Sequence, residues 1–304
     1  MKKLVLIDGH HLMFRAFYGI QNLNRVDGVA SNAIFGFLSM LLNIINQEQP
    51  TALAVAFDVG KSFRHQEDET YKSQRKEMDE NLRVQIPEIQ KMVKIAGLPV
   101  FTKEGFEADD VLGTLAKKAA KQGYQVCIIS GDRDLWQLID DQIEVAIPGN
   151  PQKPGQHFDA TSVYTELGIK PEQVPDYKGL RGDTADNIKG VPGIGPKKAQ
   201  ILIQTYQSIE NLYQNLDNLK ELEKNLLLKY QKEAFYSKYL ATIVQNVDLD
   251  FNWEDLNFQG FNPELAEFCQ DWQLKTLLPR LQKHLKMGKK TEKTYEAQLS
   301  LFGD

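Results

Sequence analysis

The sequence predicts an α/β fold in which a mostly parallel central sheet is flanked by helices. Apolar runs typical of strands occur at residues 4–7, 53–57, 100–101 and 126–129, and residues 143–147 form another with one glutamate inside it. Helical patterns lie between them, at residues 33–45, 86–96 and 111–120. Strands of a parallel sheet are joined by helices that cover both faces, so they are apolar without alternation. The order of the runs therefore indicates a parallel sheet covered on both faces.

Local signals support each of these elements. The first and second strand runs end in Asp8 and Asp58, and the fourth leads through Ser130-Gly131 to Asp132. The helix over 86–96 is stopped by Gly97. The helix over 33–45 has one apolar face, spaced three and four residues apart, made of Ile34, Phe37, Leu38, Leu41, Leu42 and Ile45.

Composition limits the class of protein. The 304 residues are 42% hydrophobic and 25% charged, which is ordinary for a globular protein of about two domains. Two cysteines, Cys127 and Cys269, exclude a disulfide scaffold and a cysteine-rich zinc site. No apolar run approaches a membrane span, and Asp8 interrupts the N-terminal run before a signal-peptide core forms. We therefore expect a cytoplasmic protein without a membrane partner.

The character of the chain changes after about residue 148. Residues 149–155 are rich in turn formers, and helical patterns dominate beyond them. We expect an α/β domain over residues 1–159, with a polar, charged segment at 62–85, and a helical module over 160–287. Residues 288–304 are polar without periodicity, which predicts a flexible tail.

Acidic residues follow the predicted strands and start the predicted helices. The carboxyl ends of parallel strands meet at one edge of a sheet, so three strand-end aspartates must point at one region. Each acid alone could instead cap a turn or a helix, but gathered carboxylates repel each other. The set comprises Asp8, Asp58, Glu107, Asp109, Asp110, Asp132, Asp134, Asp183 and Asp186.

A divalent cation would relieve this repulsion. Oxygen ligands without a Cys/His cluster favour Mg²⁺, with Mn²⁺ as a substitute. The acids exceed what one ion needs, and two ions about 4 Å apart serve phosphodiester hydrolysis. A phosphatase with Asp-x-Asp after its first strand is disfavoured, because Gly9 and His10 follow Asp8.

A glycine-rich stretch predicts contacts with nucleic-acid phosphates. Gly190, Gly193 and Gly195 lie between two helical patterns and are followed by Lys197 and Lys198. Such a hairpin, at about 188–206, presents backbone amides and a helix N-terminus to a phosphate. The alternatives are a plain turn and a Rossmann loop, and no strand precedes the glycines as a Rossmann loop requires.

The polar segment at 62–85 contains Arg64, Tyr71, Lys72 and Arg75. An aromatic ring can stack on a base, and cations can steady a phosphate. The alternative is a solvated surface helix.

Together these motifs make the sequence resemble the 5′-3′ exonuclease domain of bacterial DNA polymerase I, in the flap endonuclease family. The resemblance spans about residues 1–285. Its motifs, in the family's order, are LIDGH at 6–10, AFD at 56–58, SFR at 62–64, YKSQR at 71–75, EADDVL at 107–112, GDRDL at 131–135, GLRGDTADN at 179–187 and GVPGIGPKKA at 190–199.

The resemblance implies a resolvase-like, PIN-type nuclease core whose nine acids hold two Mg²⁺ ions, directly or through waters. It implies that Lys72 and Arg75 act on the transition state from a helical arch, while Tyr71 supports a substrate base. The glycine hairpin would be a helix-3-turn-helix that grips duplex DNA, with K⁺ on its carbonyls. The reaction would be hydrolysis of DNA, and of RNA primers, at 5′ flaps and 5′ ends, leaving a 5′-phosphate and a 3′-hydroxyl. Lys198 stands where many relatives have a threonine.

The family's polymerase modules do not follow the nuclease, so the sequence resembles a stand-alone enzyme or a fragment of a polymerase. Its ending favours the former, because residues 298–302 resemble the peptide with which bacterial replication proteins bind the sliding clamp. Gln298, Leu299, Leu301 and Phe302 would make the contacts. The alternative is a chance apolar ending.

Two other functions compete with a monomeric flap nuclease. One is a DNA-binding or clamp-adaptor protein without activity, which would have no use for repelling acids near DNA. The other is a small PIN-type ribonuclease, against which the glycine hairpin and the arch count.

Overall fold

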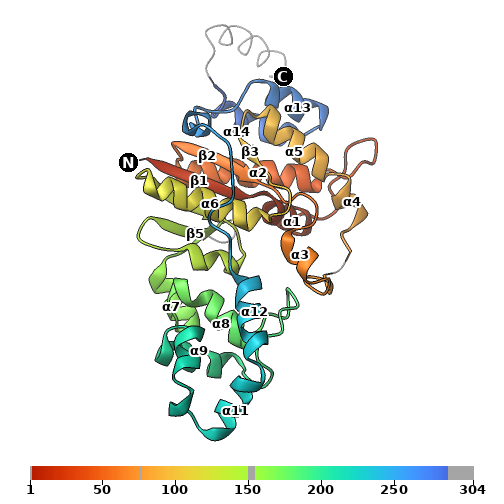
Figure 1. The fold of residues 1–304 in the computed structure, drawn as a ribbon. Helices are drawn as coiled ribbons and strands as arrows, with labels where there is room; N and C mark the ends of the chain where they lie inside the picture. The colour runs from red at the N-terminus through yellow and green to blue at the C-terminus, as the bar shows by residue number, and fades with distance from the viewer. Residues whose placement is uncertain (1, 76, 150–154, 287–304) are drawn as a thin grey trace.

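A six-stranded sheet lies at the centre of the computed structural model, which describes residues 2–75, 77–149 and 155–286 (Figure 1). The strand order is β3-β2-β1-β4-β5-β6, and only the pairing of β5 with β6 is antiparallel. The prediction of a mostly parallel α/β sheet is confirmed. The strands are β1 (Lys3–Asp8), β2 (Ala52–Ala56), β3 (Val100–Phe101), β4 (Gln125–Ile129), β5 (Ile143–Ile147) and β6 (Gln156–Phe158).

Strand β6 was not predicted, because it has three residues of which Gln156 and His157 are exposed and polar. It pairs with β5 through Val145↔Phe158 and Ala146↔His157. Short antiparallel edge strands lack the apolar run that marks the interior of a parallel sheet.

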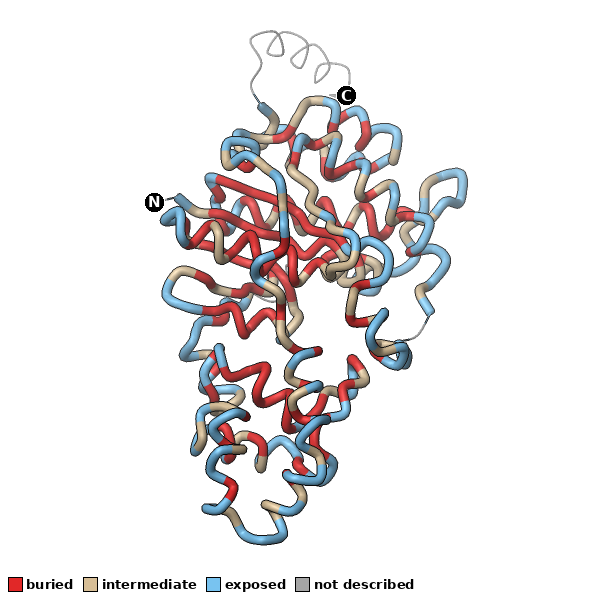
Figure 2. Tube along the Cα trace, in the orientation of Figure 1, coloured by how far each residue is buried: buried red, intermediate tan, exposed pale blue. Residues whose placement is uncertain are grey.

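Alternate residues of the strands enter two separate hydrophobic cores. Leu4 and Leu6 belong to the core covered by α6, whereas Val5 and Ile7 belong to the core beneath α1, α2 and α5. Both faces of the sheet are therefore buried, as Figure 2 shows. The covering helices are α1 (Gly9–Gly19), α2 (Asn32–Glu48), α5 (Ile86–Ile95) and α6 (Ala108–Lys121).

The connection between β1 and α1 is unusually tight. Asp8 ends the strand and caps the helix, so Gly9 is already helical. A Cβ atom at Gly9 would lie 2.2 Å from a ring carbon of Phe57. The small residue lets the first helical turn pack directly on the end of β2.

The segment expected to form an arch contains only short helices. They are α3 (Phe63–Glu67) and α4 (Glu80–Arg83), and a run of turns follows α3. Backbone hydrogen bonds tie α3 to the loop before α6, where Phe63 N donates to the Gly105 carbonyl at 2.8 Å.

A helical part lies on the α6 side of the sheet and shares its core. Val163, Ile203 and Ala234 belong to the same apolar cluster as Leu6 and Val111. This part comprises α7 (Ala160–Leu167), η2 (Pro171–Gln173), α8 (Val174–Arg181), α9 (Pro196–Tyr206), α10 (Ile209–Gln214), η3 (Leu216–Asn218), α11 (Glu221–Lys229) and α12 (Gln231–Ala241).

The expected single helical module over 160–287 is divided in the structure. After α12 the chain returns across the sheet edge, where Phe258 N donates to the Thr51 carbonyl at 3.0 Å. Leu265 and Leu281 then enter the core formed with α2 and α5, at the end of the molecule opposite to α9 and α11 (Figure 1). The returning elements are η4 (Trp253–Leu256), α13 (Glu264–Asp271), η5 (Lys275–Leu277) and α14 (Leu278–Gln282).

None of the helices in the described part of the chain has the length and apolarity that crossing a membrane requires.

The returning segment predicts a specific stability effect. Leu281 is fully buried, so Leu281→Ala should lower the free energy of unfolding by about 2–5 kcal/mol, as measured by urea denaturation. Leu222→Ala on exposed α11 is the matched control and should cost under about 0.5 kcal/mol. Equal effects would contradict the packing of the C-terminal helices on the α/β core.

Candidate active site

Four carboxylates gather at the carboxyl edge of the parallel sheet. Asp8 ends β1, Asp58 follows β2, Asp132 follows β4, and Asp109 lies in the first turn of α6. Asp8 lies close enough to Asp58 and Asp132 for their charges to raise its pKa, and Asp109 is affected in the same way by Asp132, Asp8 and Asp58. The strand-end aspartates thus meet as the sheet topology requires.

The backbone orients three of these four carboxylates. Asp8 Oδ1 accepts a hydrogen bond from His11 N at 2.9 Å, and Asp8 Oδ2 accepts one from Ser130 Oγ at 2.9 Å. Asp58 Oδ1 accepts from Ala108 N at 2.7 Å. Asp132 Oδ1 accepts from Asp134 N at 2.9 Å. Helix capping and membership of the acidic group are therefore not alternatives, because one side chain does both.

The same four acids lack neutralising cations. Within the described residues, Asp8, Asp109 and Asp132 make no ion pair, and the one partner of Asp58 is His10 Nδ1 at 3.2 Å. Burial lowers the pKa of His10, although Asp58 opposes this. Burial, and then the charge of Asp58, raises the pKa of Asp8 to about 7. Oxygen ligands with excess negative charge suit a hard divalent cation such as Mg²⁺.

The other acids of the predicted set form ion pairs with cations. We call them the paired acids: Glu107, Asp110, Asp134, Asp183 and Asp186. Lys178, which the sequence analysis did not single out, bridges Asp134 and Asp183 and lies 2.5 Å from an oxygen of Asp183. Burial acts to lower the pKa of Lys178, but the two aspartates raise it overall. Its only sequence signal is a lysine one helical turn before the Gly-Asp pair at 182–183.

The predicted arch cations reach the paired acids. Lys72 Nζ lies 2.9 Å from Glu107 Oε1 and 3.8 Å from Asp186 Oδ2, and Arg75 Nη2 lies 2.7 Å from Asp186 Oδ1. Burial opposes the charge of Lys72, yet Glu107 and its neighbours raise its pKa above the ordinary value. Lys72 is therefore a permanent cation here, suited to electrostatic stabilisation and not to proton transfer.

The structure pairs Arg64 and Asp110, for which the sequence predicted a DNA contact and a metal ligand, with each other. Arg64 is 3% exposed and Asp110 is 0% exposed, and they form a two-pronged ion pair with N–O distances of 2.7 and 2.8 Å. Arg64 Nε also donates to the Leu240 carbonyl at 2.9 Å. In this structure Arg64 has almost no exposed surface, and the carboxylate of Asp110 is occupied by the guanidinium of Arg64.

Tyr71 also differs from the expectation that it stacks on a base. Its ring is 4% exposed and packs with Ile188 and Leu240, while its hydroxyl donates to Glu107 Oε2 at 3.2 Å. Burial raises the pKa of this phenol, so it stays neutral. In this conformation Tyr71 anchors the arch segment to α12 and α6.

The glycine hairpin joins α8 to α9. Gly190 has φ of +63°, and a Cβ there would lie 2.2 Å from Gly182 N, so this glycine serves close packing within the loop. Gly193 and Gly195 are exposed, and Gly195 caps α9. The exposed N-terminus of this eleven-residue helix is suited to binding an anion.

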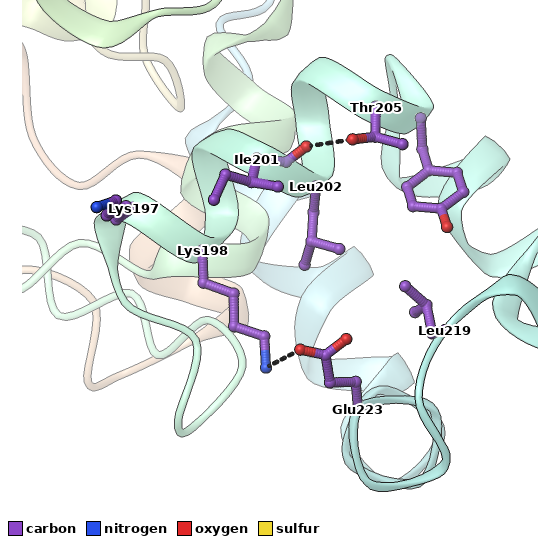
Figure 3. Close-up of a pocket in the computed structure, with 8 residues that line it drawn as sticks. Lys197, Lys198, Ile201, Leu202, Thr205, Leu219 and Glu223 are labelled. Carbon is purple, nitrogen blue, oxygen red and sulfur yellow. Dashed lines mark hydrogen bonds and ion pairs between the residues drawn. The ribbon is translucent and has the colours of Figure 1, made fainter.

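The two hairpin lysines point in different directions (Figure 3). Lys197 is exposed and lines one end of the groove between α9 and α11, but its side chain does not turn toward α11. Lys198 turns into that groove, where its Nζ lies 3.0 Å from Glu223 Oε1. Lys197 is therefore the freer phosphate contact of the two.

The burial of Asp8, together with the repulsion from its acidic neighbours, predicts a pH effect on stability in EDTA. The pKa of Asp8 is about 7 in the fold against an ordinary 3.8, so the folded state binds more protons than the unfolded state between these values. The free energy of unfolding should therefore fall as pH rises through this window. Thermal unfolding should show a lower midpoint at pH 8 than at pH 6.

Asp109→Asn should raise the midpoint at pH 8 in EDTA by removing one repelling charge. Asp255→Asn changes the same charge on an exposed 3-10 helix and serves as the control. An equal rise in the control, or greater stability of the parent at pH 8, would contradict the electrostatic origin.

The chain is similar to bacterial proteins along most of its length. It is 40% identical over 283 residues to DNA polymerase I of Caldicellulosiruptor bescii, a match that covers 92% of this chain and 33% of that protein. It is 34% identical over 287 residues to a 5′-3′ exonuclease of Aquifex aeolicus, which covers 93% of this chain and 96% of that protein. The chain thus spans about a third of the polymerase and nearly all of the exonuclease.

Among solved structures, the fold is similar to that of the bacteriophage T5 D15 flap endonuclease in a pseudo-enzyme-product complex with DNA and metal ions. The TM-score is 0.67 at 21% identity, over 92% of this chain and 98% of that one. The catalytic core of Rad2 in complex with DNA substrate gives a TM-score of 0.59 at 18% identity, over 92% and 91% of the two chains. Identities this low establish the fold alone.

Family models match two consecutive parts of the chain. The 5′-3′ exonuclease N-terminal resolvase-like domain matches residues 3–168. The 5′-3′ exonuclease C-terminal SAM fold matches residues 169–264. The resemblance on which the sequence analysis rested is confirmed, and the chain belongs to the 5′-3′ exonuclease family.

Proposed function

We propose that this protein is a divalent-metal-dependent nuclease that hydrolyses DNA at 5′ flaps and 5′ ends, and RNA primers, to a 5′-phosphate and a 3′-hydroxyl. The observation that carries the proposal is the group of four acids that form no ion pair with lysine or arginine in the described part of the chain, together with Lys72 and Arg75 on the neighbouring acids Glu107 and Asp186. The family supports nuclease activity, and the T5 and Rad2 structures to which this fold is similar are complexes with DNA.

Asp8, Asp58, Asp109 and Asp132 would hold two Mg²⁺ ions, for which Mn²⁺ could substitute. Bound metal supplies an activated water and stabilises the leaving oxygen. Lys178 holds Asp134 and Asp183 at the rim of the site, where they are suited to contacts through water.

Lys72 and Arg75 would stabilise the charge that develops on the scissile phosphate. In the structure both cations pair with acids, and Arg75 is 56% exposed, so it can exchange Asp186 for a phosphate oxygen. Preorganised cations in a partly dehydrated site stabilise such charge more than cations in water do.

Duplex DNA would bind at the α8–α9 hairpin through the α9 N-terminus, Gly193, Gly195 and Lys197. These contacts go to phosphates, so binding should be independent of sequence and sensitive to salt. We propose K⁺ at the hairpin carbonyls as an additional ligand, and a cytoplasmic monomer as the acting form.

A 3′-labelled DNA with one 5′ flap tests the reaction. Wild-type protein should cut near the junction in Mg²⁺ and not in EDTA. Asp132→Ala should abolish cleavage and retain binding, and Lys72→Ala should slow cleavage by about 10²–10³-fold. Asp255→Ala, away from the site, should retain the wild-type rate.

Binding without cleavage in Mg²⁺ and Mn²⁺ would favour the DNA-binding adaptor. Preferential cleavage of unstructured RNA would favour the PIN-type ribonuclease. Wild-type rates for Asp132→Ala would reject the assignment of the strand-edge acids.

We further propose that Gln298, Leu299, Leu301 and Phe302 bind a bacterial sliding clamp. These residues lie outside the described part of the chain, so the proposal rests on the sequence: a polar stretch ending in two apolar anchors. A tether of this kind would raise the local concentration of the nuclease at DNA that carries a clamp.

A peptide of residues 292–304 should bind a bacterial clamp in calorimetry. The same peptide with Leu301→Ala and Phe302→Ala should bind at least about tenfold more weakly, because it loses its apolar anchors. Absence of binding by the parent peptide would reject the clamp proposal and leave the nuclease proposal untouched.

A further inference from the structure

A second group of metal-ligating side chains lies away from the acidic edge of the sheet, and the strand register assembles three of its members. Cys127 on β4 pairs with Glu144 on β5. Ala146, two residues on, pairs with His157 on β6. Side chains two residues apart share a face of the sheet, so Cys127, Glu144 and His157 project from the same face of three adjacent strands.

The fourth member, Glu48, comes from the C-terminal end of α2, which covers this face. Glu48 Oε1 lies 3.3 Å from His157 Nε2, and Glu144 Oε2 lies 3.2 Å from His157 Nδ1. One ligand atom from each of the four side chains lies within 4.8 Å of every other. A tetrahedral zinc site needs about 3.4 Å between ligand atoms, so the side chains must move closer together. The two glutamates face different nitrogens of His157, so its ring must also turn to give one nitrogen to the metal.

The donor set differs in kind from that of the candidate active site. It combines a thiol, an imidazole and two carboxylates, whereas the active-site acids offer oxygen alone. Sulfur and nitrogen donors favour Zn²⁺ over Mg²⁺. Cys127 pairs with Val5, which lies three residues, or about 10 Å, along β1 from Asp8. The two groups are therefore separate sites.

A cation could reach this group from solvent. A cleft lined by Glu48, Glu144, Asp140, Asp141 and Asp159 opens beside it, and these acids favour entry of positive charge. His157 and Glu144 are 46% and 36% exposed at the side chain, so both can adjust.

Lys3 competes with a metal for the two glutamates. Its Nζ lies 2.7 Å from Glu48 Oε2 and 3.7 Å from Glu144 Oε1. Its side chain is 29% exposed, so it can swing toward water when a divalent ion arrives.

We propose that Glu48, Cys127, Glu144 and His157 bind one Zn²⁺ ion. The ion clamps the end of α2 to the β4-β5-β6 edge of the sheet, and its binding releases the thiol proton to solvent. This is a structural site, and it does not depend on the proposed nuclease activity.

Cobalt(II) titration of the reduced, full-length protein tests the site, because a thiolate bound to cobalt gives an intense charge-transfer absorption that oxygen ligands do not give. Cobalt bound to the active-site acids therefore gives no such band. We expect the band to saturate at one equivalent. It should vanish in Cys127→Ser and persist in Cys269→Ser, which alters the only other cysteine.

Two further variants test the site without changing the buried cysteine, whose substitution can disturb folding. His157→Ala, at an exposed position, should weaken cobalt binding by at least about tenfold. Lys3→Gln should strengthen it, because the competing ammonium is removed. One equivalent of Zn²⁺ should also displace the cobalt band and raise the unfolding temperature of an Asp132→Ala protein.

Absence of the band in wild-type protein, or an equal band in Cys127→Ser, would overturn the proposal. The four side chains would then be an ion-pair network centred on His157 and Lys3. Unchanged cobalt affinity in both His157→Ala and Lys3→Gln would overturn it as well.

Discussion

Repulsion among the carboxylates of Asp8, Asp58, Asp109 and Asp132 is the constraint around which the rest of the molecule is arranged. Parallel strands deliver three of them to one edge, and hydrogen bonds to backbone amides and Ser130 hold three of the four in place. The fold thereby keeps negative charges together that would separate in a flexible chain. The folded protein is therefore destabilised by repulsion at this site, and binding of a divalent cation reduces that repulsion.

Cations around this group divide the acids into two sets. Lys72, Arg75 and Lys178 pair with acids at its rim, and within the described residues no lysine or arginine forms an ion pair with the strand-edge acids. The buried pair of Arg64 and Asp110 has a different role, because it joins α3 to the start of α6 and, through Leu240, to α12. A buried pair of this kind positions elements precisely, and removing one partner leaves an uncompensated charge.

The packing of the helical part explains how the hairpin keeps its position relative to the acids. Helices α8 and α12 share a continuous apolar core with α6 and the sheet. Asp183 and Asp186 lie in the loop after α8, so the same loop contributes acids to the site and leads into the hairpin. The proposed metal and duplex contacts are therefore coupled through one short stretch of chain. On the opposite face, the returning C-terminal helices complete the second core and hold α2 and α5.

The sequence by itself determined the five parallel strands with helices α2, α5 and α6 between them, the location of the acids at strand ends, and the family. It could do so because apolar strand runs and helical periodicity are local properties of the chain, and because the topology of parallel sheets follows general rules. Only the tertiary structure decided that Arg64 and Tyr71 are buried, that Asp110 serves a salt bridge, and that Lys178 joins the site. Burial of a charged side chain depends on partners distant in the chain, such as Leu240 for Arg64, and no local pattern records them. The return of residues 258–285 to the second core, beneath α2 and α5, has the same cause, since an amphipathic helix does not specify which surface it covers.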